Sequence, residues 1–216
     1  MVLRVAIVDD HPVARQGLAT ILAPAGDLTI AVAVEACAEL PRDATGAVEA
    51  DLVILDLYLA DGRPALSDIG KLAAELPVLV ISASRMPADV LAAMQAGASG
   101  YLSKQADEQA YLTAIRSVAE GGFYLSAQLA DLLDAATTSG SAPADQPALS
   151  ARERETLSFI ARGFTHQQTA TRMGVSKATV DTYVARIRAK LTLGNKAELT
   201  LAALRYLTPP SPPSTQ

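Results

Sequence analysis

The chain has 216 residues, a hydrophobic content of 50% and a single cysteine, Cys37. This length can bury one or two hydrophobic cores, and a lone cysteine excludes an intramolecular disulfide, so we expect Cys37 to be a small buried hydrophobe. No apolar run reaches the ~18 residues of a membrane-spanning helix, and no signal-type stretch is present near the start, which indicates a cytoplasmic protein without a membrane partner.

The charge is divided unevenly along the chain. Residues 1–148 hold 8 Lys and Arg against 19 Asp and Glu, a net charge of −11, whereas residues 149–216 hold 10 against 4, a net charge of +6. A basic C-terminal part favours a nucleic-acid partner, although such a face can also be solvated or dock onto the acidic part. We therefore expect two domains with different roles.

Short apolar runs in the acidic part are typical of buried strands in a parallel α/β sheet. They span residues 2–8, 52–55, 78–81 and 100–102. Five residues with chemically useful side chains stand where these runs end: Asp9, Asp10, Asp56, Ser82 and Lys104. Because ligands bind outside the carboxyl ends of the strands in an open α/β sheet, we expect these side chains to share one site.

The residue types indicate a phosphoryl-accepting site. Three converging carboxylates repel one another, and a hard divalent cation such as Mg²⁺ relieves that repulsion. One carboxylate can then attack phosphorus, while Lys104 and the metal neutralise the transferring oxygens and Ser82 donates a hydrogen bond to one of them. The alternative is that Asp9 and Asp10 cap the helix opening at Pro12 and that Asp56 is a turn residue. Five coincident matches favour the site.

The segments around these residues resemble the receiver domain of two-component response regulators. They are Ile7 to Pro12, Asp51 to Leu57, Val80 to Ala83 and Gly97 to Lys104. The resemblance implies a doubly wound, flavodoxin-like α/β domain with a five-stranded parallel sheet over residues 1–120. It also implies that Asp56 accepts phosphate from a histidine kinase.

The same resemblance implies roles for the neighbouring residues. Asp10, Asp56 and the main-chain carbonyl of Tyr58 would hold Mg²⁺, with Asp9 reaching the ion through water. Lys104 would contact the phosphoryl group, and Ser82 and Tyr101 would form a switch pair in which Tyr101 rotates inward. The bulky Tyr58 could also screen the phosphorylated residue from attacking water.

Three positions depart from the usual receiver pattern. Ala60 and Gln105 stand where proline is frequent, and Pro41 interrupts the expected second helix. The acidic, hydroxyl and lysine positions are intact, so we expect the chain to be competent for phosphorylation.

Residues 121–148 are expected to form a linker with a short helix. Residues 126–136 have helical character, and small, polar and proline-rich residues follow, which is typical of a flexible tether. The Pro- and Ser-rich residues 209–216 are expected to be a disordered tail.

Residues 149–208 are expected to form a small all-α domain of four helices. Ser150 and Glu153 have the spacing of a capping box at the start of the first helix, which is expected to end at Gly163. Thr165 is expected to cap a second helix that runs through Met173.

Gly174 then supplies a turn, and Ser176 caps a longer third helix that reaches about Leu191. A last helix is expected from Asn195 to Tyr206. Apolar residues on the third helix recur at intervals that bury one face: Val180, Val184, Ile187 and Leu191.

Two helices joined by a glycine turn, the second with an exposed basic face, have the geometry of a helix-turn-helix DNA reader. The alternative is a helical bundle with a solvated charged face. The segments Leu149 to Glu155, Ile160 to Gly163, Val175 to Val180 and Arg188 to Leu191 look like the LuxR-type DNA-binding domain, and with the receiver they resemble the NarL/FixJ class of response regulators. The candidate DNA-contacting residues are Thr165, His166, Lys177, Thr179, Asp181, Thr182, Tyr183, Arg186, Arg188 and Lys190.

Two of these residues depart from the common LuxR pattern. Asp181 stands where lysine is frequent and Tyr183 where histidine is frequent. Asp181 could accept a hydrogen bond from cytosine, or it could pair with Lys177 four residues earlier. We expect His166 to be a capping or phosphate-contacting residue and His11 to be a helix-start residue.

Taken together, the sequence predicts a regulator of transcription that is not an enzyme. Its expected partners are double-stranded DNA, a histidine kinase and a second copy of the chain, and its expected cofactor is Mg²⁺. Three alternatives remain open: an atypical regulator controlled by a small ligand or a protein, a receiver-linked scaffold that binds protein, and a metal-dependent phosphatase with an aspartyl nucleophile. The phosphatase usually needs a second acid where this chain has Tyr58.

Overall fold

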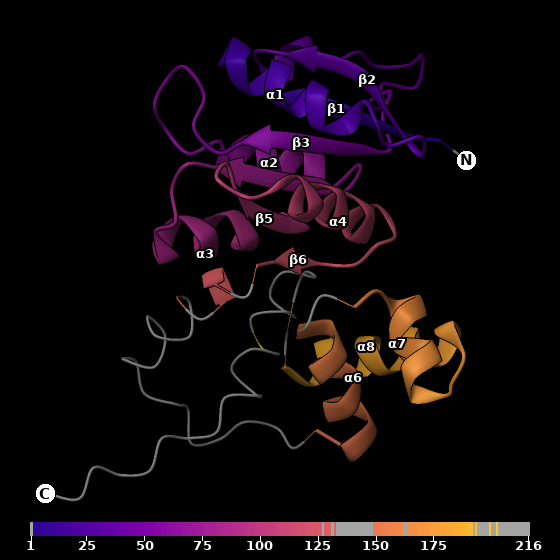
Figure 1. Cartoon of the computed structure of the whole chain (residues 1–216). Helices are drawn as coiled ribbons and strands as arrows, with labels where there is room; N and C mark the ends of the chain where they lie inside the picture. Colours follow the sequence, from indigo (N-terminus) through magenta and orange to yellow (C-terminus); the bar gives the residue numbers. More distant parts are fainter. Residues whose placement is uncertain are drawn as a thin grey trace, which may run out of the picture.

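The computed structural model describes residues 2–126, 128–130, 132, 149–161, 164–191, 193, 199 and 202 (Figure 1). The described elements of the N-terminal domain are β1 (Leu3–Val8), α1 (Pro12–Leu22), β2 (Leu28–Val34), the 3-10 turn η1 (Cys37–Glu39), β3 (Leu52–Asp56), α2 (Leu66–Ala73), β4 (Val78–Ser82), α3 (Pro87–Gln95), β5 (Gly100–Ser103), α4 (Glu108–Ala119) and β6 (Tyr124–Leu125). Those of the C-terminal domain are α6 (Ala151–Ala161), α7 (His166–Met173) and α8 (Lys177–Leu191).

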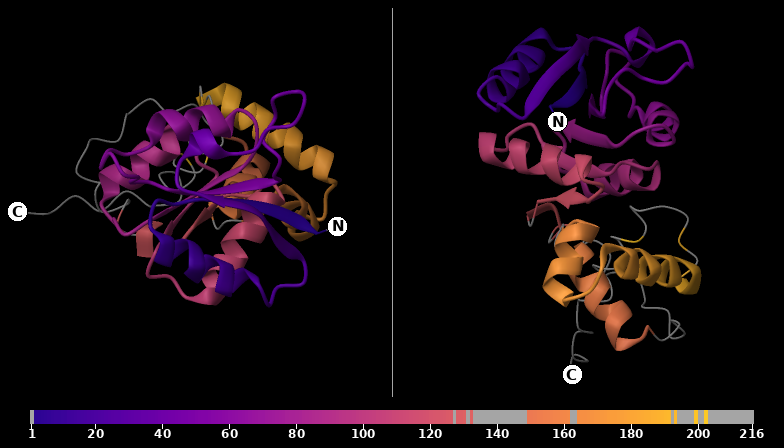
Figure 2. Two further views of the ribbon diagram at one scale, coloured as in Figure 1. Left: turned by 90° about the horizontal axis from the view of Figure 1, so that it is seen from above. Right: turned by 90° about the vertical axis from the view of Figure 1, so that its right-hand side faces the viewer.

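The N-terminal domain is a parallel sheet covered by helices on both faces, as the sequence predicts. The strand order is β2-β1-β3-β4-β5-β6, and all neighbouring strands are parallel. Figure 2 shows the sheet between two layers of helices. Side chains alternate along β1, so that Val5 and Ile7 pack toward α1 and α4, whereas Ala6 and Val8 pack toward α2 and α3. This is the flavodoxin-like fold.

The sheet has six strands and not the expected five. Strand β6 pairs with β5 through Gly100 and Tyr101, so the sheet extends beyond residue 120, where the domain was expected to end. Gly100 allows this approach, because a Cβ atom there would lie 3.0 Å from the carbonyl oxygen of Tyr124. A strand of two residues, such as β6, is too short to show a hydrophobic pattern from which it could be predicted.

Between β2 and β3 the chain forms no α-helix, in agreement with the interruption expected at Pro41. The segment contains η1 and an antiparallel bridge between Arg42 and Val48. Leu40 and Val48 are buried there and cover the sheet in place of a helix.

The helices of the C-terminal domain begin at the expected caps. Ser150 and Glu153 exchange the two hydrogen bonds of a capping box, and Thr165 forms a second box with Gln168. Gly174 has a φ of 66°, the left-handed conformation that ends α7. One apolar core joins the three helices: Leu149, Leu157, Ile160, Ala170, Val180, Val184, Ile187 and Leu199.

Several expected features lie outside the described residues. Of the expected linker 121–148, residues 121–126 are described and contain β6, and residues 128–130 and 132 are helical. The expected fourth helix is described only at Leu199 and Ala202. Gly163 and the Pro- and Ser-rich tail are also outside. Within the part of the chain that is described, no helix combines the length and the apolar character needed to cross a membrane.

Candidate functional site

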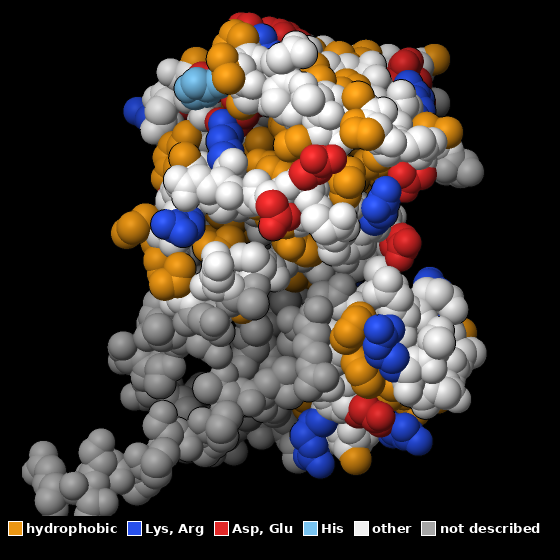
Figure 3. Space-filling view, in the orientation of Figure 1, with side chains coloured by type: hydrophobic (Ala, Val, Ile, Leu, Met, Phe, Trp, Pro, Cys, Tyr) orange, Lys and Arg blue, Asp and Glu red, His pale blue; other side chains and the backbone are white. Residues whose placement is uncertain are grey.

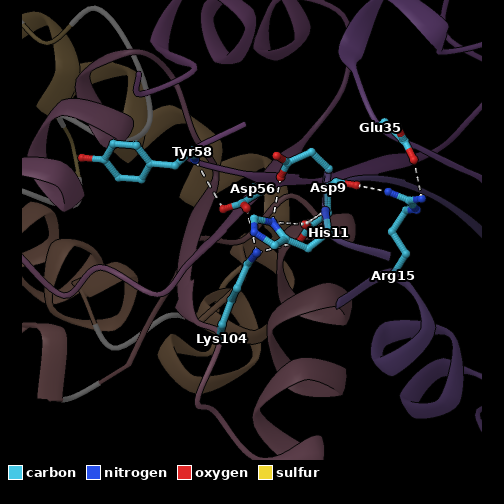
Figure 4. Close-up of polar contacts among 8 residues, drawn as sticks. Asp9, His11, Arg15, Glu35, Asp56, Tyr58 and Lys104 are labelled. Atoms are coloured by element: carbon cyan, nitrogen blue, oxygen red, sulfur yellow. Dashed lines mark hydrogen bonds and ion pairs between the residues drawn. The ribbon is translucent and has the colours of Figure 1, made fainter. Parts of the chain in front are cut away.

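An acidic pocket lies at the carboxyl edge of the sheet. Asp9 follows β1, Asp56 ends β3, Ser82 ends β4 and Lys104 follows β5. The ammonium group of Lys104 lies 2.7 Å from Asp56 Oδ2 and 2.7 Å from Asp9 Oδ2 (Figure 4). Asp9 and Asp56 are almost completely buried. Residues up to 95 positions apart in the sequence thus meet because parallel strands end at the same edge.

Burial and charge oppose each other at Asp56. Burial raises the pKa of this carboxyl group, and the nearby Lys104 only partly offsets the effect. For Lys104, burial lowers the pKa, but the carboxylates of Asp56 and Asp9 outweigh burial and raise it. The lysine is therefore held as a cation beside a carboxylate that has been removed from water.

The pocket has the donor set of a hard divalent cation. Oxygen or nitrogen atoms of Asp9, Asp10, His11 and Asp56 all lie within 4.8 Å of one another. Asp9 Oδ2 and Asp10 Oδ1 are buried and receive no aligned hydrogen bond, although Lys104 and His11 lie close to them. Buried carboxylate oxygens without aligned donors fit Mg²⁺, which prefers oxygen ligands.

His11 and Tyr58 border this pocket in different ways. His11 is the residue before α1, as expected, and its Nδ1 lies 2.8 Å from Asp10 Oδ1. Figure 4 shows the His11 imidazole over the pocket and the Tyr58 ring pointing away from it. Burial and the nearby carboxylate of Asp89, on α3, raise the pKa of Tyr58. The screening of a phosphorylated Asp56 by the Tyr58 ring stays a prediction, and in this structure the ring lies away from Asp56.

The two residues expected to act as a switch are both buried. Ser82 is 1% exposed and its hydroxyl oxygen accepts a hydrogen bond from the Ser84 amide. Tyr101 is fully buried, and its hydroxyl group donates to the Ser84 carbonyl at 3.0 Å. Burial raises the pKa of Tyr101 to about 12. Tyr101 thus already occupies the inward position that the sequence analysis assigned to the phosphorylated protein.

A second candidate surface lies on α8, which follows the glycine turn after α7. Lys177, Thr182 and Arg186 are exposed on this helix, while Val180 and Ile187 are buried. Figure 3 shows the other face of this domain, where α6 and α7 lie in front of α8, and the charged side chains there are also mostly Lys and Arg. This is a helix-turn-helix with a basic, outward-facing second helix.

Two expected DNA-contacting residues have structural roles in the domain. Thr165 is fully buried, and its hydroxyl oxygen accepts a hydrogen bond from the Gln168 amide, so it is a cap and not part of the outward surface. The ammonium group of Lys190 lies 2.7 Å from Glu153 Oε2, so it is engaged in an ion pair between α8 and α6.

The remaining candidates divide by exposure. Thr179, Tyr183 and Arg188 are half-buried, and Thr179 shares a hydrogen bond with Ser176. Asp181 lies 2.6 Å from His166 and 3.4 Å from Lys177. The pairing with Lys177 is the one that the spacing of four residues predicts, whereas the contact with His166 was not expected from the sequence.

An acidic pocket on a flavodoxin-like domain, joined to a helix-turn-helix domain, defines the class of two-domain response regulators. Comparison with known families agrees: residues 5–116 match the response regulator receiver domain, and residues 147–203 match the bacterial regulatory proteins of the luxR family.

Curated relatives match this chain over nearly its whole length. The chain is 33% identical to the probable transcriptional regulatory protein NarL of Mycobacterium tuberculosis (strain ATCC 25618 / H37Rv), covering 94% of each sequence. It resembles the crystal structure of the response regulator ChrA of a heme-sensing two-component system, with 33% identity, a TM-score of 0.52 and coverage of 95% of this chain and 98% of ChrA. A structure of two RcsB dimers bound to DNA shares the fold at 21% identity, with a TM-score of 0.54 and coverage of 96% and 100%. The chain belongs to the NarL-type response regulators, which carry a receiver domain and a LuxR-type DNA-binding domain.

Proposed function

We propose that this protein is a cytoplasmic, sequence-specific transcriptional regulator whose activity is controlled by phosphorylation at Asp56. The observation that carries the proposal is the buried Asp56 carboxylate, held 2.7 Å from the Lys104 ammonium group at the carboxyl edge of the sheet. A histidine kinase of the same two-component system supplies the phosphoryl group. The protein acts as a receiver of that group and not as an enzyme with its own substrate.

The side chains of the pocket have different roles in phosphoryl transfer. An oxygen of Asp56 forms a bond to phosphorus while the bond from phosphorus to the donor imidazole breaks. Lys104 neutralises the charge on one phosphoryl oxygen, and the Ser82 hydroxyl group donates a hydrogen bond to another. The same hydroxyl oxygen accepts a hydrogen bond from the Ser84 amide, and this bond couples the phosphoryl group to the loop that also holds Tyr101.

Asp9, Asp10 and Asp56 would hold Mg²⁺, with the Tyr58 carbonyl as a further oxygen ligand. When bound, the ion screens the carboxylates and the phosphoryl oxygens from one another. The close approach of the carboxylates and their unaligned oxygens support this assignment. His11 closes one side of the pocket beside Asp10.

The C-terminal domain would read DNA with α8 in the major groove. Lys177, Thr182 and Arg186 are exposed on this helix and are the proposed contacts to base edges, while Arg188 is a proposed phosphate contact. Phosphorylation would favour a homodimer that reads two half-sites. The RcsB structure, in which dimers bind DNA, supports this part of the proposal.

We propose that the receiver extends through β6, that the linker covers the residues between β6 and Leu149, and that the DNA-binding domain follows through about residue 208. The pairing of β6 with β5 and the luxR-family match over residues 147–203 support these limits.

Intact-mass measurement tests the proposal most directly. After incubation with Mg²⁺ and acetyl phosphate, the wild type should gain one phosphoryl group, and Asp56→Asn should gain none. Asp61→Asn, which changes an exposed acid on the loop after β3, is the matched control and should still be labelled. Labelling that persists in Asp56→Asn would contradict the assignment. Sedimentation of the labelled protein and gel shifts with duplex DNA then test dimerisation and DNA binding.

A further inference from the structure

Helix α8 carries one acidic residue among its basic ones. Asp181 lies one turn after Lys177 and next to Thr182, and its side chain is 44% exposed. DNA phosphates repel a free carboxylate, so an acid at this position weakens binding to every DNA sequence unless other side chains bind the carboxylate. In this structure His166 and Lys177 both lie close to it.

The imidazole of His166, at the start of α7, contacts this carboxylate. His166 Nδ1 lies 2.6 Å from Asp181 Oδ1, and only 22% of the His166 side chain is exposed. Burial alone raises the pKa of Asp181, but His166 and Lys177 outweigh burial and lower it, so the carboxyl group is ionised at neutral pH. An ionised carboxylate only accepts hydrogen bonds, and Nδ1 is therefore the protonated donor.

The second nitrogen of His166 is shielded from the surface. Nε2 is buried and has no hydrogen-bond partner among the described residues. A buried nitrogen is not available to a DNA phosphate, so His166 is not the phosphate contact considered in the sequence analysis. The imidazole instead makes its polar contact with Asp181, through Nδ1.

We propose that His166 is a positioning residue for DNA recognition, which holds the Asp181 carboxylate against α7 and so keeps it from facing the DNA. Lys177 contributes from the other side, at 3.4 Å from Asp181 Oδ2. Asp181 is then neither a base contact nor a free surface acid. The proposal rests on the proposed DNA-binding function. It adds that a contact between α7 and α8, from His166 to Asp181, contributes to DNA affinity.

A double-mutant cycle on the full-length protein tests this role. Binding to a fluorescein-labelled duplex of random sequence is measured for the wild type, His166→Ala, Asp181→Asn and the double variant. His166→Ala frees the carboxylate and should weaken binding about three- to tenfold, the size expected for one unscreened charge near a phosphate. In the Asp181→Asn background the same change should have less than about a twofold effect, because no carboxylate remains to be held.

Two outcomes of the cycle would overturn the proposal. Equal losses in both backgrounds would mean that His166 supports only the fold of the domain. Unchanged binding by His166→Ala would mean that the carboxylate is not screened by His166. Arg152→Ala is the matched control, since it frees Glu155 from a pair of 2.9 Å on α6 and should leave DNA affinity unchanged.

A conservative variant and a measurement without DNA complete the test. His166→Gln keeps an N–H donor within reach of Asp181 and should bind DNA more tightly than His166→Ala; equal loss in both would count against the proposal. In NMR spectra without DNA, a hydrogen-bonded Nδ1 proton of His166 should be visible in the wild type and lost in Asp181→Ala, which has no acceptor atom at this position, and its absence from the wild type would refute the contact. If the proton is present but the wild type binds no DNA, the proposed function fails and the contact stands.

Discussion

Lys190 near the end of α8 lies 2.7 Å from Glu153 in the first turn of α6, and this pair links the ends of two helices. Glu153 is nearly fully buried and also accepts a hydrogen bond from the Ser150 amide. The Lys190 contact and the Ser150 bonds lower the pKa of Glu153. The pair therefore serves the stability of the domain more than contact with DNA.

Lys190→Met should consequently destabilise the C-terminal domain by about 1 kcal/mol, the usual worth of a partly exposed charge-assisted hydrogen bond. Because the folded-state pKa of Glu153 is lowered, this stabilisation is present above the ordinary glutamate pKa and disappears as the pH falls through the folded value. Hydrogen exchange of the α6 and α8 amides at neutral and acidic pH measures it. Equal protection in Lys190→Met and the wild type would contradict the structural role.

Asp56→Asn should raise the stability of the receiver at neutral pH in the absence of divalent cations. Burial raises the pKa of Asp56 above its ordinary value of 3.8, so the folded state binds a proton that the unfolded state has already released. The wild type therefore loses stability as the pH rises from that ordinary value through the folded one, and the asparagine variant does not. Thermal unfolding of both proteins from acidic to neutral pH should show curves that separate as the pH rises.

Mg²⁺ should raise the thermal stability of the wild type. A ligand at ten times its dissociation constant stabilises the folded state by about 1.4 kcal/mol. Asp10→Ala should reduce this gain, because Asp10 belongs to the cluster of carboxylates that would hold the ion. Asp27→Ala is the control, since Asp27 precedes β2 at the opposite edge of the sheet and pairs with Arg116. A gain that is equal in Asp10→Ala and the wild type would refute the proposed ligand set.

The sequence predicts the acidic pocket well because its geometry follows from topology. Once four apolar runs are recognised as parallel strands, the residues at their ends must meet, and the positions of Asp9, Asp56 and Lys104 follow. Helix caps are also local, so Ser150 and Thr165 could be recognised from their neighbours alone.

Contacts between helices could not be predicted in the same way. His166 and Asp181 are 15 residues apart, and Lys190 and Glu153 are 37 apart. Whether such side chains meet depends on the packing angles of α6, α7 and α8, which no repeat in the sequence encodes. The burial of Thr165 has the same origin, since a good cap can face either the solvent or a neighbouring helix.

Gly100→Ala should destabilise the receiver through β6. The added methyl group would lie 3.0 Å from the Tyr124 carbonyl oxygen and 3.0 Å from Leu79 Cδ1, closer than a normal contact on both sides. Overpacking of this kind costs about 1–3 kcal/mol. Denaturant unfolding compared with Gly17→Ala, where the methyl group meets nothing within 4 Å, measures the effect. A Gly100→Ala variant that is as stable as the wild type would mean that β5 and β6 accommodate the methyl group without cost.

Arg186→Ala and Arg188→Ala should differ in how their losses depend on DNA sequence. Arg186 is exposed on the outward side of α8, so its loss should cost about 1–3 kcal/mol on a selected binding site and much less on unrelated duplexes. Arg188 is half-buried nearer the end of the helix, and its loss should weaken all duplexes alike and lower the salt slope by about one unit. Binding isotherms over a range of salt concentrations, on selected and random duplexes, separate the two. If Arg186→Ala weakens both kinds of duplex equally, Arg186 contacts the DNA backbone, and base reading must be assigned to Lys177 and Thr182.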